Sequence, residues 1–471
     1  MQMAGKFGAI RAMSLGVALV FGMAGAQGVR AENMTDAMIG AYNTSGLLEQ
    51  NRALLRAADE DVAVAVAALR PIIDWTMRAT RSLSESSSVF APTSQSSTYF
   101  TGLTFDMLIY DGGASKYGVQ AAKERVLATR QSLIEIEQGI LLRAVAAYMN
   151  VLLQTENVSL SNNNVRVLGE ELRAAQDRFE VGEVTRTDVA LAESRLAAAR
   201  SNLAFARGGL VNARAEYTNI VGHKPGTLDG QPPLPARAAS LEAAQALAMR
   251  NHPLILAAQH RVAAAELAVL QTSKSLGPSA SVGASIGLTE NFNNSDYNRD
   301  ASASIIFRQP IYRGGALAAR LRRAMAARDA ERANLLTVQR DVAQDVNNAF
   351  VRLEVARASL VATNERVRAA QVAFDGIREE ATLGARTTLD VLTAEQELLN
   401  ANTSRISDLA ERAIASYELL ARQGLLTAER LKLGVQIYDP TIYYNLVKTS
   451  PAKVSQQSRD LDRVLEALGK R

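Results

Sequence analysis

Residues 382–391 read Thr-Leu-Gly-Ala-Arg-Thr-Thr-Leu-Asp-Val, and this stretch interrupts two long runs of helical character. Residues 180–189 read Glu-Val-Gly-Glu-Val-Thr-Arg-Thr-Asp-Val and follow the same plan 202 positions earlier, with Gly182 in the place of Gly384. In both, a glycine suited to the end of one helix precedes the threonine and aspartate that begin the next. The chain is therefore predicted to contain two helical hairpins made alike, with a turn at each stretch.

The likeness between the two halves extends far beyond these turns. Tyr110-Asp-Gly-Gly and Tyr312-Arg-Gly-Gly also stand 202 positions apart, and from Tyr312 to Gly424 the second half follows the first without a gap. Such a register is hard to obtain from composition alone, so we infer an internal duplication. Each glycine pair is predicted to begin a helix of about 67 residues, about 100 Å long. Apolar residues in the second return helix recur every seven residues, as in helices that supercoil around neighbours.

Each half also begins with a shorter helical segment and then changes to strict alternation. Helical spacing covers 34–69 and 240–276, and a turn signal ends each segment. Around 99–109 and 280–288, apolar residues occupy one parity and Ser, Gly, Thr or Asp the other. This pattern predicts one β-hairpin in each half, and so four amphipathic strands in the chain.

Four strands cannot close a membrane barrel, because the smallest membrane barrels have eight. An open sheet in lipid would leave backbone groups unpaired, at a cost of several kcal/mol for each group. We therefore expect other copies of the chain to complete the barrel. The alternative, a soluble sheet buried under helices, fits the one-sided polarity less well.

The first 31 residues have the order of a secretory signal peptide. Lys6 and Arg11 precede an apolar run over 13–24, and an A-x-A-like site at 29–31 predicts cleavage before Glu32. The run is shorter than the roughly 20 residues of a spanning helix, and no later uninterrupted apolar run of that length is evident. We expect the protein to leave the cytoplasm and to meet a membrane through strands.

Composition argues against several classes of function. The net charge of +4 includes +3 from the predicted signal peptide, and the remaining charges are balanced and interspersed, so no nucleic-acid partner is expected. The chain has no cysteine, which excludes disulfides and thiolate metal sites. Its three histidines are scattered, and no phosphate loop or nucleophile motif is present. We predict no enzyme activity, no metal site and no cofactor.

The order and duplication of these motifs resemble one family. The two Gly-Gly junctions, the two glycine turns followed by Thr and Asp, and Tyr438-Asp439-Pro440 are similar to those of TolC-like outer-membrane efflux and secretion channels. The resemblance covers about 32–448. It implies a mainly α-helical homotrimer with a transmembrane β-barrel of 12 strands, four from each chain. That barrel would continue into a long periplasmic α-helical barrel with a mixed α/β equatorial belt.

On this plan the chain divides into ten expected segments. They are a signal peptide at 1–31, a periplasmic helix at 32–71, an outer-membrane hairpin at 72–110, a long helix, tip turn and return helix at 111–223, a linker or equatorial segment at 224–239, a periplasmic helix at 240–277, an outer-membrane hairpin at 278–312, a long helix, tip turn and return helix at 313–424, an equatorial segment at 425–447 and a loosely ordered polar tail at 448–471.

The resemblance implies a passive exit duct in the outer membrane of a Gram-negative bacterium, extending into the periplasm. Its implied roles are type I protein secretion, multidrug efflux or both. The implied partners are outer-membrane lipid, a periplasmic adaptor and an inner-membrane transporter of the RND or ABC type. The alternative function is a soluble periplasmic coiled-coil adaptor or scaffold, which would share the heptads but not the duplicated strand hairpins.

The same resemblance assigns a gate to the second tip. Three copies of Asp390 around a narrow mouth would form a carboxylate ring that attracts cations; the alternative is a carboxylate that stabilises its helix N-terminus. The family's second acid is replaced by Thr393. Arg386 matches the arginine that latches the closed state to a neighbouring coil, although a solvated turn arginine is the alternative. The family's tyrosine before the turn is replaced by Ala381.

Two further sets of residues are nominated. The surface that an adaptor grips, where plain C-capping by the turn glycines is the alternative, is expected at Val181, Gly182, Thr185, Asp188, Leu383, Gly384 and Thr387. The strand-to-helix junctions, where the absence of a side chain lets the backbone turn, are expected at Gly112, Gly113, Gly314 and Gly315.

Overall fold

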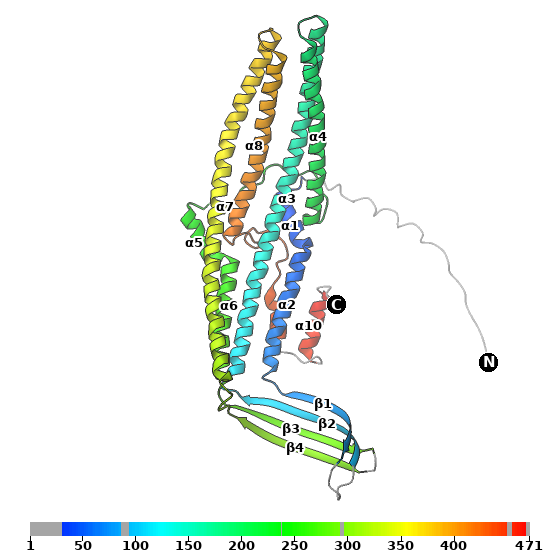
Figure 1. Ribbon diagram of the computed structural model, residues 1–471, viewed down its shortest axis with the longest axis vertical. Helices are drawn as coiled ribbons and strands as arrows, with labels where there is room; N and C mark the ends of the chain where they lie inside the picture. Colours follow the sequence, from blue (N-terminus) through cyan, green and yellow to red (C-terminus); the bar gives the residue numbers. More distant parts are fainter. Residues whose placement is uncertain (1–30, 86–93, 237, 293–295, 450–454, 468–471) are drawn as a thin grey trace, which may run out of the picture.

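The computed structural model describes residues 31–85, 94–236, 238–292, 296–449 and 455–467. Figure 1 shows an elongated chain in which long helices run side by side, with a curved sheet at one end and two helical turns at the other. The predicted signal peptide lies outside the described residues apart from its last residue, Ala31.

Two helices of 67 residues form the long axis of the chain, α3 (Ala114–Glu180) and α7 (Ala316–Thr382). The helix α4 (Arg186–Val221) returns along α3, and α8 (Thr388–Arg422) returns along α7. Each half of the chain therefore contains one helical hairpin, as the duplicated turns predict. At about 1.5 Å per residue, each long helix extends about 100 Å.

Shorter helices lie beside the half of each long helix that is nearer the sheet. The helices α1 (Met34–Thr44) and α2 (Gly46–Ala67) pack on α3. In the second half, α5 (Leu241–Asn251) packs on α7, and α6 (Pro253–Lys274) packs on both α7 and α3. The contact between α6 and α3 therefore joins the two halves of the duplication.

The prediction of one helix at 34–69 and one at 240–276 is wrong, because each segment is broken. Ser45 caps the N-terminus of α2, where its hydroxyl accepts a hydrogen bond from the N–H of Leu48 at 3.2 Å. His252 ends α5, and the next residue, Pro253, takes the first position of α6. Proline disfavours helical geometry in the residue before it and lacks an N–H, so a helix can begin at proline but not continue through it.

The four strands form a single antiparallel sheet in the order β1-β2-β3-β4. Their bounds are β1 (Ile72–Ser84), β2 (Ser94–Tyr110), β3 (Ser279–Asn291) and β4 (Tyr297–Arg308). The two predicted hairpins are joined through β2 and β3, one strand from each half. The outer strands, β1 and β4, have no second neighbouring strand among the described residues.

The register places apolar and polar residues on opposite faces of this sheet. Cross-strand partners form one row of Trp75, Leu103, Ile286 and Ala301, and the adjacent row of Asp74, Thr104, Ser285 and Ser302. Successive residues of a strand point to opposite faces, so one face is apolar and the other polar. Trp75 is 66% exposed and Ile286 is 61% exposed. The apolar face is therefore uncovered within the described chain.

The largest buried core lies halfway along the helices. It gathers side chains from α1, α2, α3, α4, α8 and the segment that follows α8, and its fully buried members include Tyr148, Tyr217, Leu55 and Leu426. Two further helices follow, α9 (Pro440–Val447), which packs on α2, and α10 (Gln456–Ala467), which packs on α9. The expectation of a loosely ordered tail is therefore wrong for residues 456–467.

Two helices of the described chain are long and apolar enough to cross a membrane by length and composition, α3 and α6. The sequence prediction is that no uninterrupted apolar run after the signal peptide is long enough to span a membrane. Half of the apolar stretch of α3 is buried inside the chain, and α3 packs against α6. Part of this apolar surface therefore serves the packing of α3 against α6.

Asp59 on α2 has a fully buried carboxylate whose loss of hydration is only weakly offset by interactions within the protein. Neither carboxylate oxygen has a hydrogen-bond partner, and the guanidinium of Arg130 on α3 lies 3.9 Å away. Burial raises the pKa of Asp59 to about 6, although Arg130 acts in the opposite direction. The pKa of Asp59 in the folded state lies above its value in the unfolded state. The contribution of the protonated carboxyl to the free energy of unfolding is therefore fully present below about pH 4 and is lost as the pH rises through about 6.

We expect Asp59→Asn to stabilise the protein above pH 6 and to leave it nearly unchanged near pH 4. The substitution removes the buried charge, and the gain is at most about 3 kcal/mol. Thermal unfolding at pH 4.5 and pH 8 measures the effect, with the exposed neighbour in Asp61→Asn as the control. An equal loss of stability at both pH values would contradict this account.

Candidate functional site

The two hairpin turns lie next to each other at the end of the chain that is farthest from the sheet (Figure 1). Gly182 and Gly384 adopt left-handed backbone geometry, with φ of 81° and 77°. In each turn, the residue after the glycine donates its N–H back to the helix carbonyl five positions earlier, Glu183 to Arg178 and Ala385 to Glu380, both at 2.9 Å. This is the hydrogen-bond pattern of a glycine-terminated helix.

The aspartates of both tips make the same bonds. Asp390 Oδ2 accepts hydrogen bonds from the N–H and the hydroxyl of Thr387, at 3.0 and 2.8 Å, and Asp188 repeats this with Thr185 at 2.9 and 2.7 Å. Each threonine hydroxyl also lies within hydrogen-bond distance of the aspartate N–H. These bonds lower the pKa of both carboxyls. Each aspartate therefore closes a capping box at neutral pH, and for Asp390 this agrees with the alternative role of stabilising its helix N-terminus.

Arg386 and Thr393 make their contacts within the second hairpin. Arg386 Nε donates to Glu380 Oε2 at 2.8 Å, and both side chains of this pair are exposed to solvent. Thr393 turns its hydroxyl back to the carbonyl oxygen of Leu389 at 2.7 Å. Ala381 is buried in a small apolar cluster. A link from Arg386 to a neighbouring coil is not among the contacts of the described chain and stays a prediction.

The residues predicted to meet an adaptor lie on the surface of the two turns. Val181 is 72% exposed and Leu383 is 80% exposed, and the two occupy equivalent positions of the duplication. Gly182, Gly384 and both capping threonines are exposed as well, and Asp188 is partly exposed. Each tip thus presents one apolar side chain beside its turn glycine.

The four junction glycines lie between the sheet and the long helices. Gly112 and Gly113 connect β2 to α3, and Gly314 and Gly315 connect β4 to α7. All four have positive φ, between 55° and 88°. A residue with a Cβ would be strained at these positions, so the backbone turn itself explains the glycines.

A buried polar contact joins the two hairpins, and sequence reasoning did not nominate it. Asn164 Nδ2 on α3 donates to Glu395 Oε1 on α8 at 2.5 Å, and both side chains are buried. Burial, with a smaller contribution from the carboxylate of Glu171, raises the pKa of Glu395 to about 7, while Arg195 lowers it. The sequence contains one indication that Glu395 is buried. It follows Leu392 by three residues and precedes Leu399 by four, and this spacing places it on the apolar face of α8.

An ion pair also joins the same two hairpins. Arg378 Nε on α7 is 3.2 Å from Glu171 Oε1 on α3. Leu392 of α8 is fully buried among apolar side chains of α3 and α4. Among the described residues, two apolar clusters and two polar links thus join the tip halves of the hairpins, and the second cluster packs Val167 of α3 against Phe374 and Val391.

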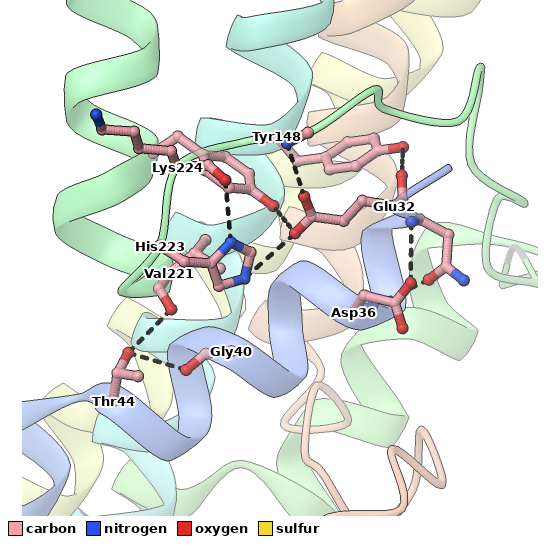
Figure 2. A network of polar contacts seen from close by, with 11 residues as sticks. Glu32, Asp36, Gly40, Thr44, Tyr148, Val221, His223 and Lys224 are labelled. Carbon is pink, nitrogen blue, oxygen red and sulfur yellow. Dashed lines mark hydrogen bonds and ion pairs between the residues drawn. The ribbon is translucent and has the colours of Figure 1, made fainter. Parts of the chain in front are cut away.

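Figure 2 shows a polar network halfway along the helices, centred on Glu32, which we call the equatorial clasp. The backbone of Glu32 donates to the carbonyl oxygen of Thr227 at 2.9 Å and accepts from the N–H of Asp229 at 2.8 Å. Its carboxylate accepts from the Tyr217 hydroxyl at 2.5 Å and lies 3.5 Å from His223 Nε2. The start of the first helical segment is thereby tied to α4 and to the linker.

Tyr148 completes the clasp from α3. Its hydroxyl donates to the carbonyl oxygen of Asp229 at 2.6 Å and lies 3.2 Å from that of Glu32. Burial raises the pKa of Tyr148 to about 12, and burial together with the bond to Glu32 raises that of Tyr217. Both hydroxyls therefore remain hydrogen-bond donors at any physiological pH. The described residues contain no cluster of three or more His, Asp or Glu side chains that could bind a metal.

Comparison with known proteins gives consistent matches. A protein-family model described as outer membrane efflux protein matches residues 41–223 and 232–424. The outer membrane efflux protein BepC of Brucella suis is 34% identical over 429 residues, which are 90% of this chain and 92% of BepC. The alkaline protease secretion protein AprF of Pseudomonas aeruginosa is 27% identical over 316 residues, which are 64% of this chain and 65% of AprF.

Solved structures support the fold. The outer membrane channel CmeC of Campylobacter jejuni matches with a TM-score of 0.73 at 15% identity, covering 89% of this chain and 90% of that one. The two stretches matched by the family model coincide with the two halves of the duplication.

We expect Tyr217→Phe to destabilise the protein by about 1–3 kcal/mol, because the half-buried carboxylate of Glu32 loses its shortest hydrogen bond. Thermal unfolding of the detergent-extracted protein measures the loss, with Tyr110→Phe on the exposed end of β2 as the control. If Tyr217→Phe behaved like Tyr110→Phe, the clasp would not contribute to stability.

Proposed function

The chain belongs to the outer membrane efflux protein family, and from this we propose that three copies of it form a passive exit duct across the outer membrane and periplasm. Family membership confirms the resemblance to TolC-like channels and the location in the outer membrane. The observation that carries the proposal is the open four-stranded sheet with one uncovered apolar face.

The sheet supports assembly from several copies. Its strands are 12 to 17 residues long, enough to cross the lipid core, where about 9–11 tilted residues suffice. The edges β1 and β4 carry backbone groups that lipid cannot satisfy, so β4 of one copy must pair with β1 of another. Three chains with four strands each would close a barrel of 12.

The helices support the same arrangement. Apolar side chains stand exposed along α7 and α4, among them Val355, Val372, Phe205 and Val211. In a ring of copies these faces would pack against neighbouring hairpins, which would leave a hollow tube continuous with the barrel. Such a duct has no energy source of its own and depends on a partner.

The tips are where we propose gating and docking. Asp390, Arg386 and Thr393 would line the closed mouth, and Arg386 would latch it. An adaptor would grip the exposed side chains beside the two turn glycines, Val181 and Leu383, and would connect the duct to an inner-membrane transporter of the RND or ABC type. Similarity to an efflux protein and to a protease secretion protein supports export of small molecules, of polypeptide or of both.

We expect the protein from outer-membrane fractions to migrate as an SDS-resistant trimer and to conduct ions in a planar bilayer. Both results follow if strands from three copies close one barrel. The alternative, a soluble periplasmic adaptor or scaffold, predicts a monomer that carbonate extracts from membranes. A carbonate-extractable, non-conducting monomer would overturn the duct.

We expect Asp390→Asn to reduce the block of single-channel current by divalent cations, because it removes a ring of three carboxylates from the mouth. Asp188→Asn is the matched control, since Asp188 makes the same capping box in the other hairpin. If both variants conducted like the wild type, or if both changed equally, Asp390 would have no place at the constriction.

A further inference from the structure

Within one chain, the two hairpins contact each other through α3 and α8. The faces of α7 and α4 that correspond to this contact in the duplication lie on the outer sides of the same hairpins. Figure 1 shows α3 and α8 between α4 and α7 in the tip half, so that α4 and α7 are outermost. The duplication maps α3 onto α7 and α8 onto α4. A ring built from such hairpins would therefore place α7 of one copy against α4 of the next, as α3 lies against α8 within a chain.

The seam within the chain is defined by residues at heptad spacing. On α3 these are Asn164, Val167 and Glu171, and on α8 they are Leu392, Glu395 and Leu399. The polar pair at its centre, Asn164 with Glu395, is buried, and no ion pair of the described residues includes Glu395. We use the positions of this contact between α3 and α8 to locate the equivalent positions on α7 and α4.

The equivalent positions, 202 residues away, are exposed, and the two central side chains carry opposite charges. On α7 they are Arg366, Ala369 and Ala373, and on α4 they are Ala190, Glu193 and Ala197, all exposed. The central pair becomes an arginine and a glutamate, which carry opposite charges. The flanking alanines are small, so two helices could approach closely there.

Arg366 has donors available for such a contact. Its Nε and Nη2 donate to Glu397 Oε1 of its own hairpin, at 3.0 and 2.7 Å. A guanidinium has five N–H donors, so Nη1 remains for a second carboxylate. Glu193 makes no ion pair among those of the described residues and stands exposed on α4.

We propose that Arg366 of one copy binds Glu193 of the next copy, as the counterpart between chains of the Asn164–Glu395 pair within a chain. The proposal rests on the trimeric duct and specifies the register of its helical wall. The six seams of the tip half would then alternate between a buried asparagine–glutamate pair inside each chain and an arginine–glutamate pair between chains.

Cysteine crosslinking tests the register, because the chain has no cysteine of its own. In the full-length protein in outer membranes, we expect Arg366→Cys with Glu193→Cys to form disulfide-linked dimers and trimers that persist after boiling in SDS. A disulfide requires Cβ atoms about 3.5–4.5 Å apart, so Arg366→Cys with Ser194→Cys should give about tenfold less product. Asn164→Cys with Glu395→Cys should crosslink within one chain and remain a monomer on the gel.

Charge reversal tests the ion pair itself. We expect Arg366→Glu to lower the temperature at which the SDS-resistant trimer dissociates, and the added Glu193→Arg to restore it. If the wild type is a trimer but neither the crosslink nor the rescue appears, the pair is wrong and the duct stands. If the wild type itself is a monomer, the proposed duct fails, and the pair fails with it.

Discussion

In lipid, every backbone N–H and C=O needs a hydrogen-bond partner within the protein. The rest of this structure depends on that constraint. Four strands satisfy one another across three ladders, but β1 and β4 leave two rows of groups open. Water could hydrate these edges, whereas hydrocarbon cannot. The rows of Trp75 and Ile286 on one face, and of serine and aspartate on the other, assign lipid to the first face and water to the second. A chain with this sheet is one part of a barrel.

The duplication produced two helical hairpins. Their tips have the same turn and capping box, whereas the side chains along their helices differ. Both tips keep the same glycine turn and the same threonine–aspartate capping box, because each helix end must satisfy its own backbone groups. The sides are free to diverge. Glu395 is buried against Asn164, whereas its equivalent, Glu193, is exposed on α4, where we propose the contact with another copy. One ancestral seam has thus become a contact within the chain and a surface for a contact between chains.

The equatorial clasp holds several segments of this elongated chain together halfway along its helices. Glu32 is near none of its partners in sequence, yet its backbone and carboxylate are bound by α3, α4 and the linker. Two fully buried tyrosines provide the hydroxyls, and their raised pKa values keep those hydroxyls protonated. Beside this point, apolar side chains from six segments form the largest core.

Local chemistry alone was enough to predict both 67-residue helices, the four alternating strands and the glycine turns, because periodicity and backbone preference act over a few residues. It also placed Gly182, Gly384 and the capping aspartates. The break at His252 was missed although Pro253 signalled it, and α10 was missed because a polar amphipathic segment needs a surface to pack on. Glu395, Asp59 and the clasp depended on tertiary structure, because the burial of a carboxylate is decided by residues far away in the chain.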